Sequence, residues 1–366
     1  MRLAWKELIR RPSRFLTAGG ALTLIVILLL LLGGLLYGLY LSATAAIRAQ
    51  SAAVIVYSAD SRDSLLRSRI EPSTREQVAS VDGVESVSGF GIALLGAEIP
   101  GQSDLADVAL FGYEAPNARV PAPLPTGQVY ADRTLQDERV AIGDTLLLGP
   151  AKTPVTVQGW VQDTAYLFQG GLWGDAETWR SVLAANRPDQ VLGPGTFQAL
   201  LVTPHEGVSP QQVADAIGGQ VPGVSALTRQ EAILALPGVE QQSSTFASII
   251  GVTFVVAGLV VALFFALVTL ERVGLFGVLK AIGAGSRRLA AGLAFQALLI
   301  AGGAFALGGV LTLVLAQVIP PEVPLQLLPK RAVFIAIGIV VTALIGSAIS
   351  FRRIVRIDPA SAVGGS

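Results

Sequence analysis

Four long stretches of this sequence contain no Asp, Glu, Lys or Arg. Each holds at least the roughly 20 apolar residues that a helix needs to cross a hydrocarbon core of about 30 Å. The chain of 366 residues is 52% hydrophobic and 14% charged, whereas a soluble globular domain carries about a quarter charged residues. We therefore predict a membrane protein with four transmembrane helices, at residues 15–41, 246–270, 289–318 and 332–351.

The first apolar stretch follows a basic start, as the core of a secretory signal peptide does. Its length exceeds the roughly 7–15 residues of such a core, so we expect it to be a retained helix.

The Lys and Arg residues predict the orientation of the chain. Residues 1–14, 271–288 and 352–366 together carry 12 basic and three acidic residues, whereas residues 42–245 carry 12 basic and 22 acidic ones. Because loops rich in Lys and Arg stay in the cytoplasm, we expect an amphipathic N-terminal segment, the middle connection and the tail to be cytoplasmic. Residues 42–245 and a short loop at 319–331 then lie outside. Anchoring of helix ends at lipid head groups would explain the terminal basic clusters equally well and predicts the same topology.

The outer segment is long enough to form its own core. Strand-like runs occupy residues 53–57, 83–99, 107–113, 140–148, 154–160 and 197–203, with glycines expected to break the second run. Helices are predicted at 74–81, with Ser73 as N-cap and Glu76 completing a capping box, and at 209–217, with Pro210 first. Residues 164–179 are rich in aromatic side chains, which form either an exposed lip or part of a core. The predicted fold class is thus an α-helical membrane protein with four transmembrane helices and a large α+β extracytoplasmic domain inserted between helices 1 and 2.

Several chemistries are excluded by what the sequence lacks. None of the four lysines follows a glycine, so there is no phosphate-binding Gly-Lys-Ser/Thr loop. The single histidine, His205, has no Gly-x-Ser-x-Gly partner motif, and there is no cysteine and no zinc signature. The predicted spans contain no ionisable Asp, Glu, Lys or Arg, which argues against an ion-coupled carrier. The formal net charge of zero gives no argument for nucleic acid. We expect no catalytic residue, no metal site and no cofactor in this chain.

The connection between the second and third spans predicts a short amphipathic helix. Its apolar residues Leu275, Val278, Leu279 and Ile282 recur at three- and four-residue steps, and Gly283 is suited to end it. A ridge of this kind either lies at the membrane interface or fits the groove of a partner.

This connection resembles the coupling-helix region of the FtsX/MacB-type ABC transporter permeases, whose pattern ends here as Leu279-Lys280-Ala281-Ile282-Gly283-Ala284. The order of parts along the chain resembles the same family. The charged pair that family members often carry is replaced by Gly274 and Leu275. The resemblance implies a bacterial plasma-membrane permease that forms a homodimer and docks a separate ATPase, which binds ATP and Mg. It implies ATPase coupling through Glu271, Arg272, Leu275, Val278, Leu279, Lys280, Ala281, Ile282, Gly283 and Ala284.

Within that family, the layout is most similar to the heme-exporter (HrtB-like) and DevC-like permeases, which implies a hydrophobic substrate with heme as a candidate. Tyr37, Tyr40 and Glu240 are the polar residues placed for a substrate; an interfacial aromatic belt and a helix cap explain them as well. Gly34 and Gly38 form a Gly-x-x-x-Gly pattern suited to helix packing. The alternative function is a mechanotransmission or scaffold protein that regulates an outer-side enzyme without transport. The need for a periplasmic adaptor is left open.

Overall fold

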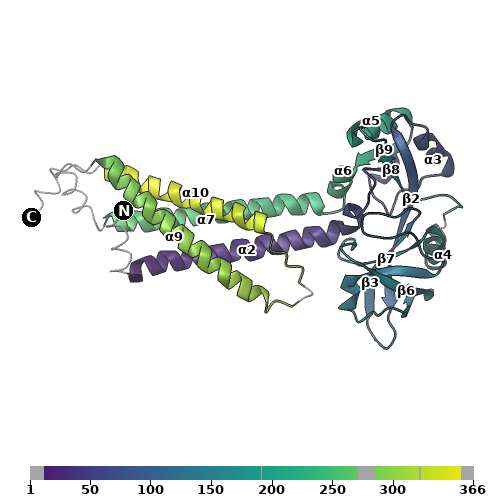
Figure 1. Cartoon of the computed structure of the whole chain (residues 1–366), viewed down its shortest axis with the longest axis horizontal. Coiled ribbons are helices and arrows are strands. Elements are labelled where there is room, and N and C mark those ends of the chain that lie inside the picture. The colour runs from purple at the N-terminus through teal and green to yellow at the C-terminus, as the bar shows by residue number, and fades with distance from the viewer. Residues whose placement is uncertain (1–11, 191, 271–284, 321–322, 356–366) are drawn as a thin grey trace, which may run out of the picture. The chain divides into compact units, whose positions relative to one another are not determined.

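A computed structural model describes residues 12–190, 192–270, 285–320 and 323–355 of the chain. The chain divides into two compact units (Figure 1). Leu39–Ser243 forms one unit, which we call the sheet domain. Met1–Gly38 and Ser244–Ser366 form the other, which we call the membrane unit.

The long helices of the described chain agree with the sequence prediction in number and order. They are α2 (Pro12–Arg48), α7 (Val239–Leu270), α9 (Ser286–Ala316) and α10 (Pro329–Val355). Each contains a window long and apolar enough to cross a bilayer. The predicted class of four apolar helices with an α+β domain between the first and second is therefore confirmed. Helix α2 continues past the predicted end of the span to Arg48, because its last turns belong to the sheet domain.

The membrane unit has a core of its own, built by all four helices. Small side chains bring the helices close together: Gly308 of α9 lies against Val26 of α2, and Gly346 of α10 lies against Gly258 of α7. The opposite faces of α7, α9 and α10 carry exposed Leu, Val and Ile side chains. Burial of small residues with outward-facing aliphatic ones is the pattern of helices that pack within lipid.

The sheet domain is a mixed sheet with short helices. Its strands are β1 (Val54–Ser58), β2 (Val84–Glu98), β3 (Leu105–Tyr113), β4 (Gln128–Asp132), β5 (Thr145–Leu148), β6 (Thr153–Val161), β7 (Gly170–Asp175), β8 (Ala199–Pro204) and β9 (Val224–Thr228). Its α-helices are α3 (Pro72–Ala79), α4 (Ala176–Asn186), α5 (Pro210–Gln220) and α6 (Arg229–Leu234), with 3₁₀ turns at Ala59–Ser61, Arg133–Gln136 and Pro188–Gln190.

The nine strands form one sheet in the order β3-β7-β4-β6-β5-β2-β8-β1-β9, and β3 also pairs with β2. That extra pairing closes β3, β7, β4, β6, β5 and β2 into a ring, from which β8, β1 and β9 extend. The β3–β7 and β4–β6 pairs are parallel and the others are antiparallel. Strand β2 connects the two parts, since its first half pairs with β8 and its second half with β3 and β5.

The structure corrects the expectation that glycines break the second strand-like run. Strand β2 is continuous, and its glycines leave room for aromatic rings instead. A Cβ atom on Gly89 would overlap the Phe197 ring, and one on Gly91 would overlap the Trp179 ring. These glycines are therefore explained by close packing across the sheet.

Two further local predictions were wrong. The run at 140–148 forms a strand only from Thr145, because Ala141–Asp144 is a turn in which the Ala141 N–H donates to the Asp144 carboxylate (2.8 Å). Helix α3 begins at Pro72 with Glu71 as N-cap, so the predicted capping box from Ser73 does not form. Pro fits the first helical position because it has no N–H to satisfy. The prediction for α5 was right, with Pro210 first.

Most of the aromatic side chains between residues 164 and 179 belong to the core. Tyr166, Trp173 and Trp179 are buried, and the Trp173 ring stacks on Phe111 with centroids 4.3 Å apart. Only Phe168 of this group is exposed, at 55%. Of the two interpretations left open by the sequence, core packing holds for this segment apart from Phe168.

Candidate functional site

The last turns of α2 are built into the core of the sheet domain. Ala43, Ala46 and Ile47 are buried in the same cluster as Phe111, Tyr166 and Trp173. The small alanine side chains allow the helix backbone to approach the segment after β6. There, the Ala46 N–H donates to the Ala165 carbonyl (2.9 Å) and the Leu167 N–H donates to the Ala43 carbonyl (3.1 Å). The end of α2 is thus fixed by both apolar packing and backbone hydrogen bonds.

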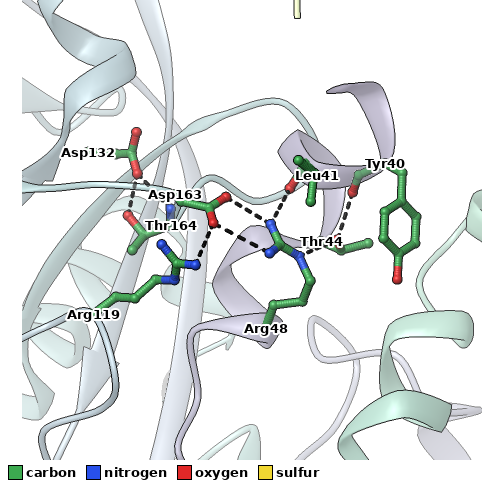
Figure 2. Close-up of polar contacts among 8 residues, drawn as sticks. All are labelled: Tyr40, Leu41, Thr44, Arg48, Arg119, Asp132, Asp163 and Thr164. Atoms are coloured by element: carbon green, nitrogen blue, oxygen red, sulfur yellow. Dashed lines mark hydrogen bonds and ion pairs between the residues drawn. The ribbon is translucent and has the colours of Figure 1, made fainter. Parts of the chain in front are cut away.

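An ion-pair cluster fastens the same helix end (Figure 2). Arg48 Nη2 lies 2.8 Å from Asp163 Oδ1, and Arg119 Nη2 lies 2.8 Å from Asp163 Oδ2. Arg48 also donates from Nη2 to the Leu41 carbonyl (3.1 Å) and from Nε to Thr44 Oγ1 (3.1 Å). A cation in the last turn complements the negative end of the helix dipole, and it offsets the nearby Asp163 carboxylate. We call Arg48, Arg119 and Asp163 the α2 clamp.

The loop that carries Asp163 is itself held by a buried carboxylate. Asp132, at the end of β4, accepts hydrogen bonds at Oδ2 from the Thr164 N–H (2.7 Å) and from Thr164 Oγ1 (2.5 Å). Asp163 has a positive φ of 57°, so the loop turns sharply before it meets α2. Adjacent residues of the loop after β6 therefore contact two elements: Thr164 contacts Asp132 of β4, and Asp163 contacts Arg48 of α2.

Burial also shapes the ionisation of the tyrosines in this core. Desolvation of the buried phenol raises the pKa of Tyr166 above its ordinary value. Desolvation is also the main cause of the raised pKa of Tyr57 and of Tyr113. All three therefore stay neutral well above physiological pH. The α2 clamp and the packing of these phenols hold the helix end in place.

In the membrane unit, Gly34 and Gly38 face a non-helical segment, residues 323–328. The Gln326 N–H donates to the Gly34 carbonyl (3.1 Å). A Cβ atom on Gly34 would lie 2.8 Å from Leu327 Cδ2, and one on Gly38 would overlap the backbone of Pro324. The structure thus places the segment between α9 and α10 against the Gly-x-x-x-Gly pattern, where the sequence prediction had proposed helix packing.

The residues predicted for the substrate are divided between the two units of the chain. The Tyr37 ring belongs to the membrane unit and lies under the Arg331 guanidinium, 4.5 Å from ring centroid to Cζ. Tyr40 belongs to the sheet domain and packs against its core. Glu240 lies in the first turn of α7. The predicted coupling residues, Glu271 to Ala284, lie outside the described residues.

The structure also bears on His205, on metal binding and on a contact that the sequence did not reveal. His205 is exposed in a loop, where its backbone N–H donates to the Gly83 carbonyl (2.9 Å). Among the described residues, no group of three or more His, Cys, Asp or Glu side chains is arranged to hold a metal ion. Sequence reasoning missed the α2 clamp, since Arg48 marked only the end of an apolar run. The sequence did offer one signal, which is the position of Arg48 where the first long helix leads into a folded domain.

These features define a class of protein: a multi-pass membrane protein in which a bundle of four helices carries a large α+β domain between the first and second helices. Residues 247–359 match the family described as FtsX-like permease C-terminal. The chain thus contains a region similar to the FtsX-like permeases, and its curated relatives are ABC transporter permeases. The predicted family resemblance and the prediction that this chain is not the ATPase are confirmed by these matches.

Curated relatives support the same assignment. An uncharacterised ABC transporter permease of Mycobacterium bovis is 36% identical over 155 residues, which are 41% of this chain and 43% of the relative. A putative hemin transport system permease protein, HrtB, of Staphylococcus epidermidis is 24% identical over 145 residues, 40% of this chain and 41% of that protein. The matches thus span less than half the length of these relatives.

Among solved structures, the periplasmic region of MacB from Actinobacillus actinomycetemcomitans is similar at a TM-score of 0.34 and 14% identity, covering 50% of this chain and 92% of that one. A similarity this low supports no statement about function.

Proposed function

We propose that this chain is the permease subunit of an ATP-driven system that exports or extrudes a hydrophobic substrate. The observation that carries the proposal is the FtsX-like match over residues 247–359. The matched region includes α9, α10, most of α7, and the connection between α7 and α9. A chain without a phosphate-binding loop needs a separate motor, so ATP and Mg bind to a partner ATPase in this proposal.

The proposed contact with that ATPase is the amphipathic segment from Glu271 to Ala284, with Leu275, Val278, Leu279 and Ile282 as its apolar ridge and Lys280 beside it. Two copies of this chain dock two copies of the ATPase. Both termini and this segment lie in the cytoplasm of a bacterial cell, as the excess of Lys and Arg there favours. A tag fused after Ser366 should then be inaccessible from outside intact cells.

The coupling proposal is tested by replacing Leu279 or Ile282 with Asp. A charge on the apolar ridge should prevent co-purification of the ATPase and abolish transport, because an unpaired carboxylate cannot enter an apolar groove. The matched control is Ser286→Asp, at the first position of α9, where a carboxylate suits the helix dipole. Unchanged co-purification and transport in the Leu279→Asp and Ile282→Asp variants would remove the proposal.

Heme is the most specific substrate that we propose to test. The support is the sequence similarity to the HrtB permease and the tyrosine at position 37, since Tyr is one of the side chains that ligate heme iron. A spectral titration with hemin should give a saturable shift that Tyr37→Phe weakens. Tyr40→Phe and Glu240→Gln test the other two proposed substrate residues. If the wild-type chain gives no saturable spectral shift, heme is excluded as the substrate. The proposal then keeps only the broader class of hydrophobic substrates.

The second candidate function is mechanotransmission without transport, and the α2 clamp favours it. Helix α2 is continuous from the membrane unit into the sheet domain, where Arg48 and the buried turn before it anchor its end. Movement of the spans would then be passed to the sheet domain and to an outer-side enzyme or adaptor bound there. ATPase activity stimulated by a substrate in liposomes would favour transport. Activation of a bound outer-side hydrolase without solute movement would favour mechanotransmission.

A further inference from the structure

The membrane unit contains a cavity of about 240 Å³ between α2, α9, α10 and the segment at 323–328. Its walls are mainly apolar, with Leu30 from α2, Phe305 from α9, Leu327 from the segment and Ile335 from α10. Thr312 also lines it, but its hydroxyl already donates to the Gly308 carbonyl (2.7 Å). The cavity therefore suits a hydrocarbon group and offers little to a polar one.

One cation stands in the lining of this apolar space. Arg331, in the first turn of α10, is the only ionisable side chain among the described residues that line the cavity. Within residues 12–190, 192–270, 285–320 and 323–355, it makes no ion pair with a carboxylate. The start of α10 adds the positive end of a helix dipole at the same place. An anionic group is the ligand that complements this environment.

The contact with Tyr37 orients Arg331 for such a ligand. Its guanidinium lies over the Tyr37 ring, 4.5 Å from Cζ to the ring centroid. Stacking occupies a face of the guanidinium, while its N–H groups point outward in the plane and match the oxygens of a phosphate. Tyr37 thus fixes the cation at the end of the span that leads into the sheet domain.

The size of the cavity distinguishes between amphiphiles. Pockets for drug-sized ligands measure about 300–1,000 Å³, and an apolar cavity of about 150 Å³ holds a benzene molecule. A volume of about 240 Å³ therefore accepts a stretch of a single alkyl chain more readily than a large ring system. The anionic phospholipids of the bilayer, such as phosphatidylglycerol, combine alkyl chains with an anionic head and surround the helices of a membrane protein.

We propose that this cavity is a binding site for an anionic phospholipid of the surrounding bilayer, with one acyl chain between α2, α9 and α10 and the phosphate at Arg331. The site lies in the leaflet at the Tyr37 end of α2. Bound there, the acyl chain packs against Leu327 and so supports the segment that contacts Gly34 and Gly38. This site shares Tyr37 with the proposed heme contact, but the proposal does not depend on which molecule is transported.

The head-group contact is tested by lipid retention. The purified full chain is equilibrated with equal amounts of phosphatidylglycerol and phosphatidylcholine, and bound lipid is counted by native mass spectrometry. We expect wild type to prefer phosphatidylglycerol about fivefold, since a basic side chain near a membrane surface contributes about 1 kcal/mol toward an anionic lipid. Arg331→Gln should bring the ratio close to one. The matched control is Lys330→Gln, which removes the neighbouring cation outside the cavity lining and should keep the preference.

The acyl-chain contact is tested by filling the cavity. A Cβ atom on Gly309 meets no atom within 4 Å, and Gly309 lines the cavity, so Gly309→Leu should occupy the space without a clash and abolish retention of both lipids. Gly303→Leu is the control: it makes the same change on α9 at a glycine that is equally open and does not line the cavity. It should retain lipid as wild type does.

A second measurement keeps the proposal testable if a variant fails to fold. Phosphatidylglycerol with a photoreactive acyl chain, reacted with wild-type protein, should label peptides that contain Phe305–Leu313 or Leu327–Ile335. Labelling confined to other helices would overturn the proposal. So would equal loss of preference in Arg331→Gln and Lys330→Gln, retention unaffected by Gly309→Leu, or a wild-type protein that binds both lipids alike.

Discussion

Arg48 and Asp163, 115 positions apart in the sequence, meet at 2.8 Å between Nη2 and Oδ1 and join the last turn of α2 to the loop after β6. Asp163 is shared with Arg119, so one carboxylate pairs with two guanidinium groups. Only 21% of the Arg48 side chain and 32% of the Asp163 side chain is exposed. Partial burial lessens screening by solvent, and the helix end is therefore held by a contact stronger than a surface ion pair.

The first prediction concerns the strength of this contact. A double-mutant cycle with Arg48→Ala and Asp163→Ala should give a coupling free energy of about 1 kcal/mol, because the pair is partly buried and joined by charged hydrogen bonds. The free energy of unfolding is measured with the full chain in mild detergent from Trp fluorescence, which reports on the buried Trp173 and Trp179 of the sheet domain.

The matched control is the Lys152–Glu98 pair, with a similar separation of 2.9 Å but side chains 60% and 41% exposed. Its coupling energy should be near zero, since exposed pairs are screened. Additive effects of Arg48→Ala and Asp163→Ala would show that the α2 clamp does not hold the helix end.

The second prediction concerns coupling between the two units. Asp163→Asn keeps the size of the side chain but removes the charge that both arginines share. If α2 passes movement to the sheet domain, this variant should still co-purify with the ATPase and keep its basal ATP hydrolysis, while transport or enzyme activation falls severalfold. Glu98→Gln removes an exposed carboxylate from the same domain. It should leave co-purification, basal ATP hydrolysis and transport or enzyme activation unchanged. Transport or enzyme activation at the wild-type level in Asp163→Asn would show that the α2 clamp takes no part in coupling between the two units.

The third prediction concerns the glycines of α2. Gly38→Ala should destabilise the membrane unit by about 1–3 kcal/mol, the usual range for overpacking, because its Cβ would overlap the Pro324 backbone. Gly33→Ala is the control on the same helix, since its Cβ would meet only Ile335 Cδ1 at 3.7 Å, an ordinary contact. The two variants are compared by thermal unfolding in detergent. Equal stability would mean that residues 323–328 do not pack against Gly38.

Some features of this fold are set by local composition, and others by contacts between residues far apart in the sequence. Four charge-free stretches were sufficient to predict the four apolar helices, because lipid excludes ionised side chains over a fixed length. Pro210 likewise predicted the start of α5, since the preference of Pro for the first helical position depends only on the local sequence.

Features that depend on distant residues could not be read in the same way. The glycines at 89 and 91 looked like strand breaks, because the rings of Phe197 and Trp179 that require them come much later in the chain. Arg48 was only the charged residue that ends the first charge-free stretch, and its partner Asp163 could be identified only once the loop after β6 was placed beside α2. The contact of Gly38 with Pro324 joins α2 to the segment before α10 and has no local signal.

The last prediction uses the buried phenol of Tyr166, whose pKa is raised by desolvation in the folded state. Below a pH of about 10, the ordinary pKa of tyrosine, the phenol is neutral in both folded and unfolded chains. Above that pH, the unfolded chain loses the proton while the folded chain keeps it, so the unfolded state is favoured as pH rises. Tyr166→Phe removes this term and leaves that of Tyr113 unchanged. It also removes the smaller contribution of Tyr166 to the raised pKa of Tyr57, which acts in the same direction.

The unfolding free energy of Tyr166→Phe minus that of wild type should therefore stay constant from about pH 7 to about pH 9 and then rise by roughly 1 kcal/mol per pH unit above about pH 10. Denaturant titrations of the full chain in detergent, followed by Trp fluorescence at each pH, measure this difference. A difference that stays flat through about pH 11 would mean that the Tyr166 phenol ionises as readily in the folded protein as in the unfolded chain. The packing of α2 against the Tyr166 cluster would then admit water, and the buried helix end described above would be wrong.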